Sequence, residues 1–516
     1  MRVGLGKWWA VVVAAGAPAF ATNAEAQTAP QASAPALVPL HTSPSATPDV
    51  VPNELLAVTP GGLTGAQVGE RAGATSYNAK AQNEALKSAA ARVDEAWAAF
   101  LPRLSGVASY TRLSPLTPPS LFGAAPPLQP LAAGTNEPLF RNFYTNNWTG
   151  FYNGLANASF PVFVNQWLLQ ATLTVPISDY FLRLTQSYSA ATHSRDAARF
   201  DQIAARATSA ADGRVTFYTW LGARGAVIVA VQALNDQRSH LSLAKNQFDV
   251  GQASKSDVLR AETNVTSAEL QVVHAKNLAD LSEKQVRVAM HARDDEPAAP
   301  GESLEVNPPP YQGNVRELIN EALAARMEIR SIDANAVAAR EQVKAGVANQ
   351  LPNLQGFGDA IYANPNQRLI PPEQEWFPTW DLGVRLTWSP NDTLTGSSNV
   401  ADLKAHAAQL EAQKGTLRDN IEIEVTQAFQ NVREADVSLD SAKHELESAE
   451  EAYRVTKELF NNGRATSTTL TDSETELTRS RLDLLTARVN ARTARVRLDH
   501  ALGRDVHLVD SGPGSQ

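Results

Sequence analysis

The segment FDVGQASKSDVLRAET (residues 248–263) has a counterpart, FNNGRATSTTLTDSET (residues 460–475), at a constant offset of 212 residues. In each copy a glycine, Gly251 or Gly463, lies between two long stretches that contain no proline. A glycine can adopt the positive φ that ends a helix, so each copy predicts the turn of a helical hairpin. The chain is therefore interpreted as an internal duplication with one hairpin in each half.

Proline placement shows where the other helices lie. The chain has 30 prolines, and none of them falls between positions 60 and 102, 176 and 297, 310 and 352, or 390 and 513. A proline inside a helix costs about 3 kcal/mol, so these spans are predicted to be helical, and they run short, long, short, long. The predicted organisation is a first repeat over 61–297, a linker over 298–313, a second repeat over 314–505 and a short tail over 506–516.

Apolar residues in the long spans are spaced alternately by three and four positions. Five successive heptads of this kind are typical of a coiled coil. A helix over residues 182–248 would be about 100 Å long, and the returning arm plus one short span would together match it. The second repeat shows the pattern at Val425, Ala428, Val432, Ala435, Leu439, Ala442, Leu446, Ala449, Tyr453, Thr456 and Phe460.

Two segments between the helical spans have the other periodicity. Residues 167–177 and 380–388 alternate apolar and polar side chains, which predicts strands. Their length of about 10 residues, with tryptophan at one end, fits a strand of an outer-membrane barrel, although a soluble hairpin would show the same alternation. Residues 104–111 and 354–362 are the expected partners. Four strands are too few to close a barrel, so several chains would have to build it together.

The N-terminus predicts export. Arg2 and Lys7 precede an apolar run of 14 residues, and Ala24-Glu25-Ala26 before Gln27 is a cleavage site of the small-x-small type. The run is too short to span a bilayer, which takes about 20 residues. Residues 1–26 are therefore predicted to be a signal peptide, and the Pro- and Ala-rich residues 27–60 a flexible lead-in.

Composition excludes several classes of function. The chain has no cysteine, and its net charge of −9 comes without a basic stripe, so nucleic acid is not an expected partner. The nine histidines are scattered, which predicts no metal site. Ser242-Leu243-Ala244-Lys245 fits an S-x-x-K pattern but lies within a predicted coiled-coil arm, without the companion motifs of that enzyme class. We expect neither a cofactor nor an enzymatic activity.

After the lead-in, the whole chain resembles the outer-membrane efflux proteins of the TolC family. The resemblance rests on the order helix, strand pair, helical hairpin, given twice, and on the repeated glycine turn. It implies a mainly α-helical fold with a membrane β-barrel, in which long coiled-coil hairpins form a periplasmic α-barrel. Three protomers would contribute four strands each to a 12-stranded barrel. The implied partners are a homotrimer, a periplasmic adaptor, an inner-membrane transporter reached through that adaptor, and outer-membrane lipid.

The resemblance also assigns roles to residues at the turns. The tip loops that contact the adaptor would be Val250-Gly251-Gln252 and Asn462-Gly463-Arg464, and the pore entrance would contain Asp257, Asp472, Ser256, Phe460 and Arg464. The chain departs from the family at three positions near the turns. Phe460 stands where a gating tyrosine is common, Thr469 replaces a second pore carboxylate, and Arg464 lies one position before the usual arginine. We therefore expect Arg464 to pair with Asp257 or Asp472 in the closed state.

The function implied is passive passage of substrates from an inner-membrane pump across the periplasm and the outer membrane. Two other classes also carry long helices and an export signal. A periplasmic adaptor should have one hairpin and a lipoyl-like or β-barrel domain, and a trimeric coiled-coil surface protein should have one uninterrupted stalk. The duplicated order of helices and strands disfavours both.

Overall fold

The computed structural model describes residues 58–115, 128, 138–156, 163–293, 298–370 and 373–506. The predicted signal peptide over 1–26, nearly all of the lead-in over 27–60 and all but the first residue of the tail over 506–516 lie outside the described residues.

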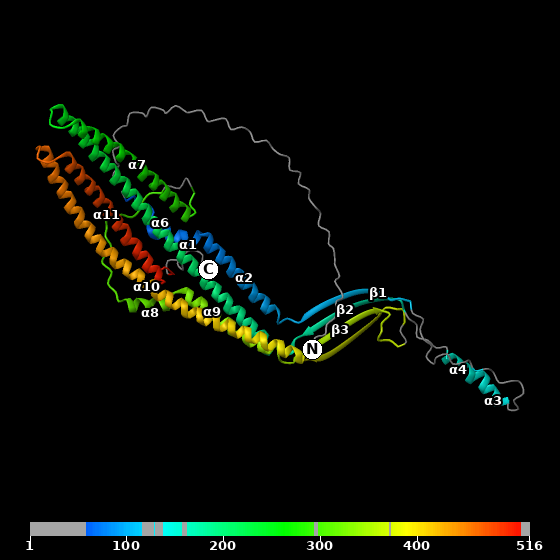
Figure 1. Ribbon diagram of the computed structural model, residues 1–516. Coiled ribbons are helices and arrows are strands. Elements are labelled where there is room, and N and C mark those ends of the chain that lie inside the picture. Colours follow the sequence, from blue (N-terminus) through cyan, green and yellow to red (C-terminus); the bar gives the residue numbers. More distant parts are fainter. Residues whose placement is uncertain are drawn as a thin grey trace, which may run out of the picture. The chain divides into compact units, whose positions relative to one another are not determined.

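The order of elements is given twice along the chain (Figure 1). The first half contains α1 (Gly65–Thr75), α2 (Tyr77–Ala98), β1 (Arg103–Arg112), β2 (Asn165–Val175), α5 (Ile177–Leu182), α6 (Leu184–Asp249) and α7 (Lys255–Ala289). The second contains α8 (Val315–Ala325), α9 (Met327–Ala348), β3 (Asn353–Asn364), β4 (Phe377–Thr387), α10 (Pro390–Asn461) and α11 (Ser467–Ala501). Corresponding short helices have equal lengths of 11, 22 and 35 residues, and α6 and α10 have 66 and 72.

The long helix α6 is the core of the helical part. It packs against α1, α2 and α7 of its own half and against α9 and α11 of the other half. Among the described helices α6 is long and apolar enough to cross a membrane, but half of its most apolar window is buried. That burial is what a core helix requires. In the second half α8, α9 and α11 pack on α10 in the same way, as the helix lengths predicted.

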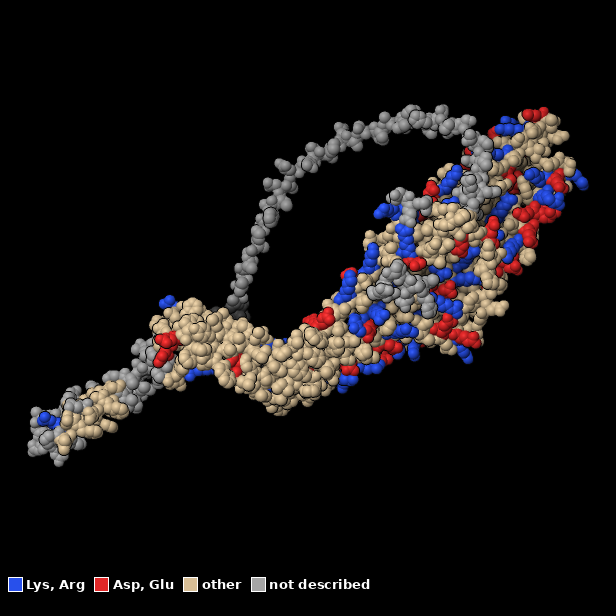
Figure 2. Space-filling view, turned by 180° about the vertical axis from the view of Figure 1, so that it is seen from behind, with Lys and Arg blue, Asp and Glu red and all other residues tan. Residues whose placement is uncertain are grey.

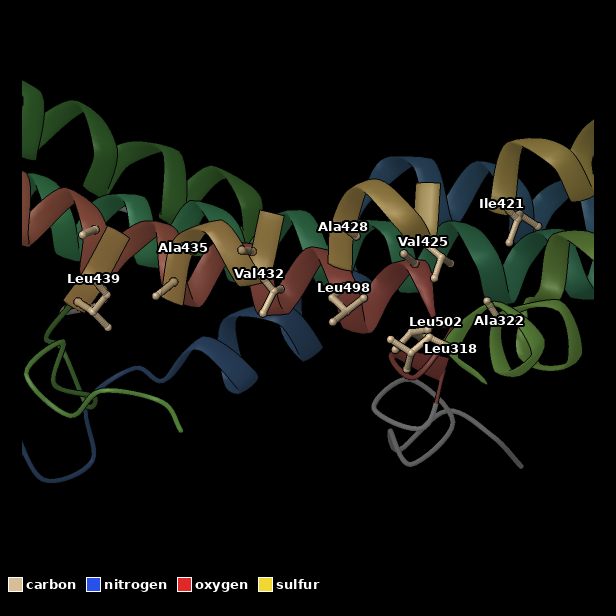
Figure 3. Packing of buried hydrophobic residues seen from close by; sticks show 14 of the residues in the cluster. Leu318, Ala322, Ile421, Val425, Ala428, Val432, Ala435, Leu439, Leu498 and Leu502 are labelled. Atoms are coloured by element: carbon tan, nitrogen blue, oxygen red, sulfur yellow. The ribbon is translucent and has the colours of Figure 1, made fainter. Parts of the chain in front are cut away.

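The heptad seams are buried, which confirms the coiled-coil prediction. On α10, Val425 and Val432 have no exposed surface, and they pack with Leu498 of α11 and with residues of α8 in one cluster (Figure 3). Small seam residues such as Ala491, which is fully buried, let the helices approach closely. The seam therefore fixes the helices of each hairpin along their full length.

The short helical spans are broken, which the proline pattern did not predict. Ser76 separates α1 from α2 with an extended ψ of 135°, and its hydroxyl accepts a hydrogen bond from the amide of Asn78. Arg326, with ψ 131°, separates α8 from α9 and forms ion pairs with Glu328 and Glu424. A side-chain cap at one break and two ion pairs at the other thus replace one turn of backbone bonding, and neither break needs a proline.

The four strands form one antiparallel sheet in the order β1-β2-β3-β4, which confirms the strand prediction. Strand β2 ends at Val175, two residues earlier than expected, because Pro176 precedes α5. The register places most apolar side chains on one face and most polar ones on the other, with Leu168, Phe357 and Ile361 among the exceptions on the polar face. The apolar face carries Leu104, Tyr110, Trp167, Leu169, Leu173, Leu354, Tyr362, Trp380, Leu382, Val384 and Leu386, and the other carries Arg103, Ser105, Gln170, Thr172, Thr174, Gln355, Asp359, Asp381, Arg385 and Thr387.

The connection between β1 and β2 is long and contains helical segments. They are α3 (Pro138–Asn142), a π-helical turn (Phe143–Trp148) and α4 (Thr149–Ala156). The connection between β3 and β4 is much shorter, with Asn366 donating a hydrogen bond to the carbonyl of Phe377. The two strand pairs therefore differ chiefly at their connected ends.

The linker between the halves is strapped to the helices by arginines of α11. Arg492 pairs with Glu302 and donates to the carbonyls of Ser303 at 2.8 Å and Val306 at 2.7 Å. Glu302 also accepts a hydrogen bond from the hydroxyl of Tyr218 at 3.1 Å. Burial, followed by the charge of Glu302, raises the pKa of Tyr218. Charge-assisted hydrogen bonds from α11 thus hold this linker, which has no helix of its own at these residues.

We predict that Arg492→Ala releases the linker. The change leaves Glu302, whose side chain is 26% exposed, without its cation, and removes two bonds to carbonyl groups, a loss of about 2 kcal/mol. Limited proteolysis with chymotrypsin should then cut residues 304–311 at least about tenfold faster. Arg238→Ala, which breaks the more exposed pair with Glu269, should leave the linker intact. Equal protection in both variants would show that Arg492 is not the strap.

Candidate functional site

The candidate site lies at the tips of the two hairpins, at the end of α6 and α10 that is far from the sheet (Figure 1). Gly251 and Gly463 have φ of +77° and +70°, which confirms the predicted turns. In both turns the amide after the glycine bonds back to the long helix, from Gln252 to Gln247 and from Arg464 to Leu459, each at 2.8 Å. The two tips therefore share one backbone geometry.

The predicted tip-loop residues are solvent-exposed. Val250 is 69% exposed, and Gln252, Asn462 and Arg464 are exposed as well. A side chain added at either glycine would meet no atom within 4 Å, so only the positive φ requires glycine there. The loops thus offer a free surface on a fixed backbone, with their adaptor contact still a prediction.

Asp257 caps the helix that leaves the first tip. Its carboxylate accepts hydrogen bonds from the Ser254 amide at 3.1 Å and the Ser254 hydroxyl at 2.6 Å, and its own amide donates to that hydroxyl. These bonds, those of the hydroxyl foremost, hold the pKa of Asp257 below its ordinary value. Ser256 is exposed beside it, and its hydroxyl lies 2.6 Å from that of Ser254. Asp257 is therefore ionised and pinned to its own helix.

The second tip has the same cap without a charge. The hydroxyl of Thr466 accepts from the amide of Thr469 at 3.2 Å and lies 2.9 Å from the Thr469 hydroxyl. Asp472 is exposed one turn further along α11. Arg464 is exposed too, and among the described residues it pairs with neither Asp257 nor Asp472. The expected pairing of Arg464 is thus not present within one protomer.

Phe460 is buried within the protomer, at 5% exposure. Its ring meets the edge of the His240 imidazole, with centroids 5.6 Å apart. A phenyl ring has no polar atom to place in water, whereas a tyrosine hydroxyl would. At this position the chain therefore has a packing contact within the protomer, and the place of Phe460 at the pore entrance stays a prediction.

A buried polar pair connects the two hairpins close to the tips. His240 of α6 and Glu474 of α11 are 3% and 5% exposed, and Nδ1 of the histidine lies 3.2 Å from the carboxylate. Gln237 donates to the same carboxylate at 3.0 Å, and Ser467 lies 3.3 Å from Nε2 of His240. Sequence analysis missed this pair. The only sign of the pair in the sequence is one titratable residue, His240 in α6 and Glu474 in α11, at a helix position that becomes buried.

A second polar bond joins the hairpins on the outside. Arg260 of α7 donates to the hydroxyl of Thr468 at 2.9 Å. No group of three or more potential metal ligands occurs among the described residues. The interactions available at the tips are therefore hydrogen bonds and charge attraction between helices. Such contacts can hold the two hairpins together and can be broken when the hairpins separate.

Comparisons with known proteins match most of the chain. The family described as outer membrane efflux protein matches residues 75–290 and 318–504. The chain is similar to the Campylobacter jejuni CmeC outer membrane channel, with 16% identity and a TM-score of 0.66 over 90% of this chain and 93% of that one. It is also similar to the Neisseria gonorrhoeae MtrE outer membrane channel in its open state, with 15% identity and a TM-score of 0.64 over 85% and 88%.

A third similar structure is that of CusC, with 13% identity and a TM-score of 0.68 over 89% of this chain and 99% of that one. The search of curated proteins gives no match. At these identities the structural likeness shows the fold.

We predict that the first tip loosens in acid and the second does not. Because the folded pKa of Asp257 is lowered, its cap is complete above the unfolded pKa near 3.9 and is lost as the pH falls through the lower folded value. Hydrogen exchange at residues 255–258, corrected for the intrinsic rate, should accelerate about two- to thirtyfold between about pH 5 and pH 2. The first turn of α11 serves as the internal control, and Asp257→Asn should abolish the response. The same acceleration in both turns would contradict the assignment.

Proposed function

The chain belongs to the outer membrane efflux protein family, and on this basis we propose that it is the exit duct of a tripartite efflux or secretion system. Three copies form a channel through the outer membrane and the periplasm. Substrates enter from an inner-membrane transporter through a periplasmic adaptor, and they pass without chemical change. The energy comes from that transporter.

The observation that carries this proposal is the sheet with two different faces and two free edges. Within the described residues β1 and β4 each pair on one side only. In a bilayer the unpaired backbone groups of a strand edge have no water to bond, so each edge requires another strand. Three four-stranded sheets joined edge to edge give a closed barrel of 12 strands with the apolar face toward lipid. Figure 2 agrees, because charged side chains on the face shown gather over the helices and are sparse over the sheet.

Exposed apolar stripes on the helices support the same assembly. On α7, Leu270, Leu281 and Val288 are 55%, 56% and 60% exposed, and on α10, Ile423 and Val437 are 67% and 68% exposed. Both stripes lie outside the buried seams of their hairpins. A neighbouring copy that packs its α10 on this α7 would cover both, so the helical wall would close around the same threefold axis as the sheet.

The adaptor contact is proposed at the tips. An open groove of about 650 Å³ lies between α6, α7 and α11 and extends from near the tips toward the middle of the hairpins. Its walls include small residues such as Ala230 and Ala268 and polar ones such as Gln271 and Thr475. Small residues allow close approach of a helix backbone, and the amides and hydroxyls offer hydrogen bonds. We therefore propose this groove as a docking surface for the helical hairpin of an adaptor.

The alternatives fit less well. The described residues contain two hairpins joined through a sheet, whereas an adaptor needs one hairpin with a separate β-domain. A surface stalk would not break its helices at Ser76 and Arg326 or return through four strands. Channel function is also that of the family and of the similar structures.

We predict that Val384→Arg reduces the yield of trimers. Val384 is 66% exposed on the apolar face of β4, and an arginine near the middle of the bilayer costs about 2–4 kcal/mol. Thr387→Arg is the control, since Thr387 shares the polar face with Arg385. Heat-modifiable migration of an outer-membrane fraction on a gel measures the trimer. Equal trimer yields for the two variants would contradict either the assignment of the lipid-facing side of the sheet or its location in the membrane.

We predict that the exposed tip charges tune conduction. In a trimer Asp472 occurs three times around the entrance and attracts cations, so Asp472→Asn should shift the reversal potential toward zero in a salt gradient. If Arg464 pairs with a carboxylate of a neighbouring protomer, Arg464→Ala should raise the conductance of the closed channel. Planar-bilayer recordings measure both quantities. Wild-type behaviour of both variants would place the gate elsewhere.

A further inference from the structure

The pair His240–Glu474 is the most deeply buried contact of titratable groups between the two hairpins in the described residues. The two side chains are 1% and 4% exposed, and 234 residues separate them along the chain. His240 lies nine residues before the end of α6, about 14 Å from the tip at 1.5 Å per residue. The pair therefore lies near the tips, and separation of the hairpins there would have to break it.

Both protonation states of His240 can satisfy their hydrogen bonds, but they differ in charge. A neutral ring donates from Nδ1 to Glu474 and accepts at Nε2 from the Ser467 hydroxyl, and a charged ring donates from both nitrogens. When the ring is neutral, the Glu474 carboxylate is buried with the Gln237 amide as its other partner and no counter-charge. An uncompensated buried charge is costly, and hydration of Glu474 by separation of the hairpins relieves that cost.

We propose that His240 and Glu474 form a latch that holds the two hairpins of one protomer together at the tip, and that it weakens when His240 loses its proton. The inference rests on the proposed channel function for its consequence, which is easier opening of the entrance above neutral pH. Histidine is the side chain whose charge ordinarily changes between about pH 5 and 8. Phe460 packs on the ring and shields it from water.

Groups on every packed helix act on this pair. Asp257 of α7 is close enough for His240 to contribute to the lowering of its pKa, after the bonds from Ser254. Tyr453 of α10 has a pKa raised by burial and by the charges of Asp236 and Glu474. The titratable groups that face the pair are Asp236 on α6, Asp257 on α7, Tyr453 and Lys457 on α10, and Arg481 on α11. Arg481 pairs with Asp236 at 3.4 Å, and the basic side chain that Glu474 contacts directly is His240.

The experiment measures the distance between the hairpins. The chain has no cysteine, so spin labels on Asp249→Cys and Asn461→Cys, at the ends of α6 and α10, are uniquely placed. Labelled protomers are diluted with unlabelled ones so that distances within one protomer dominate. We expect the distance distribution of the otherwise wild-type trimer to broaden and lengthen by several ångströms between about pH 6 and pH 8.5.

Variants separate the latch from a merely structural contact. His240→Leu alone strands the buried carboxylate and should give the longer distance at both pH values. The double change His240→Leu with Glu474→Leu replaces the pair by apolar groups, which proteins often tolerate, and should give the shorter distance at both. His444→Leu is the matched control, because His444 also lies beside two carboxylates but is 73% exposed; it should keep the wild-type response.

A pH-independent distance in the wild type, or a pH response that persists in the double variant, would overturn the latch. Planar-bilayer recordings of the unlabelled wild type test the channel separately. If no conductance is found, the proposed function fails whatever the distances show. If conductance is found but the distance does not respond to pH, only the latch fails.

Discussion

Close packing of α6 against its neighbours is the interaction on which the rest of the structure depends. A side chain at Gly225 would place its first carbon 2.6 Å from Leu485 of α11, and at Gly222 2.8 Å from Val489. These glycines let the two helices touch, although glycine costs about 1 kcal/mol of helix propensity at each position. Because α6 also holds α7 and α9, this contact joins the two halves of the duplication and sets the spacing of their tips.

The helices could be predicted from the sequence because their pattern repeats over many turns. Five heptads average out local exceptions, and the absence of proline marks the limits. Strands β1 and β3 were harder, since Gly106, Gly356 and Gly358 stand on the apolar face and Val107 on the polar one. Alternation disappears when small residues replace apolar ones. The breaks at Ser76 and Arg326 depend on one cap and two ion pairs, which leave no periodic trace in the sequence.

The candidate site also has features that the sequence could predict and features that it could not. The turns at Gly251 and Gly463 were predictable because a positive φ is a local property of a few residues. The pair His240–Glu474 was not, because it joins residues from opposite halves of the chain, and each alone looks like an ordinary polar residue on a helix. The inward position of Phe460 follows from that pair, since the ring packs against the imidazole.

The duplication has kept the backbone and changed the charges. Equal lengths of α7 and α11 bring both tips to the same level, so six hairpins from three copies could form one ring of similar walls. The caps differ, however, with the carboxylate of Asp257 at one tip and the hydroxyl of Thr469 at the other. A ring with sixfold shape would then have threefold charge, with fixed anions on the first hairpins and the exposed Asp472 on the second. Geometry closes such a ring, and the difference in chemistry lets the two kinds of hairpin play different parts in it.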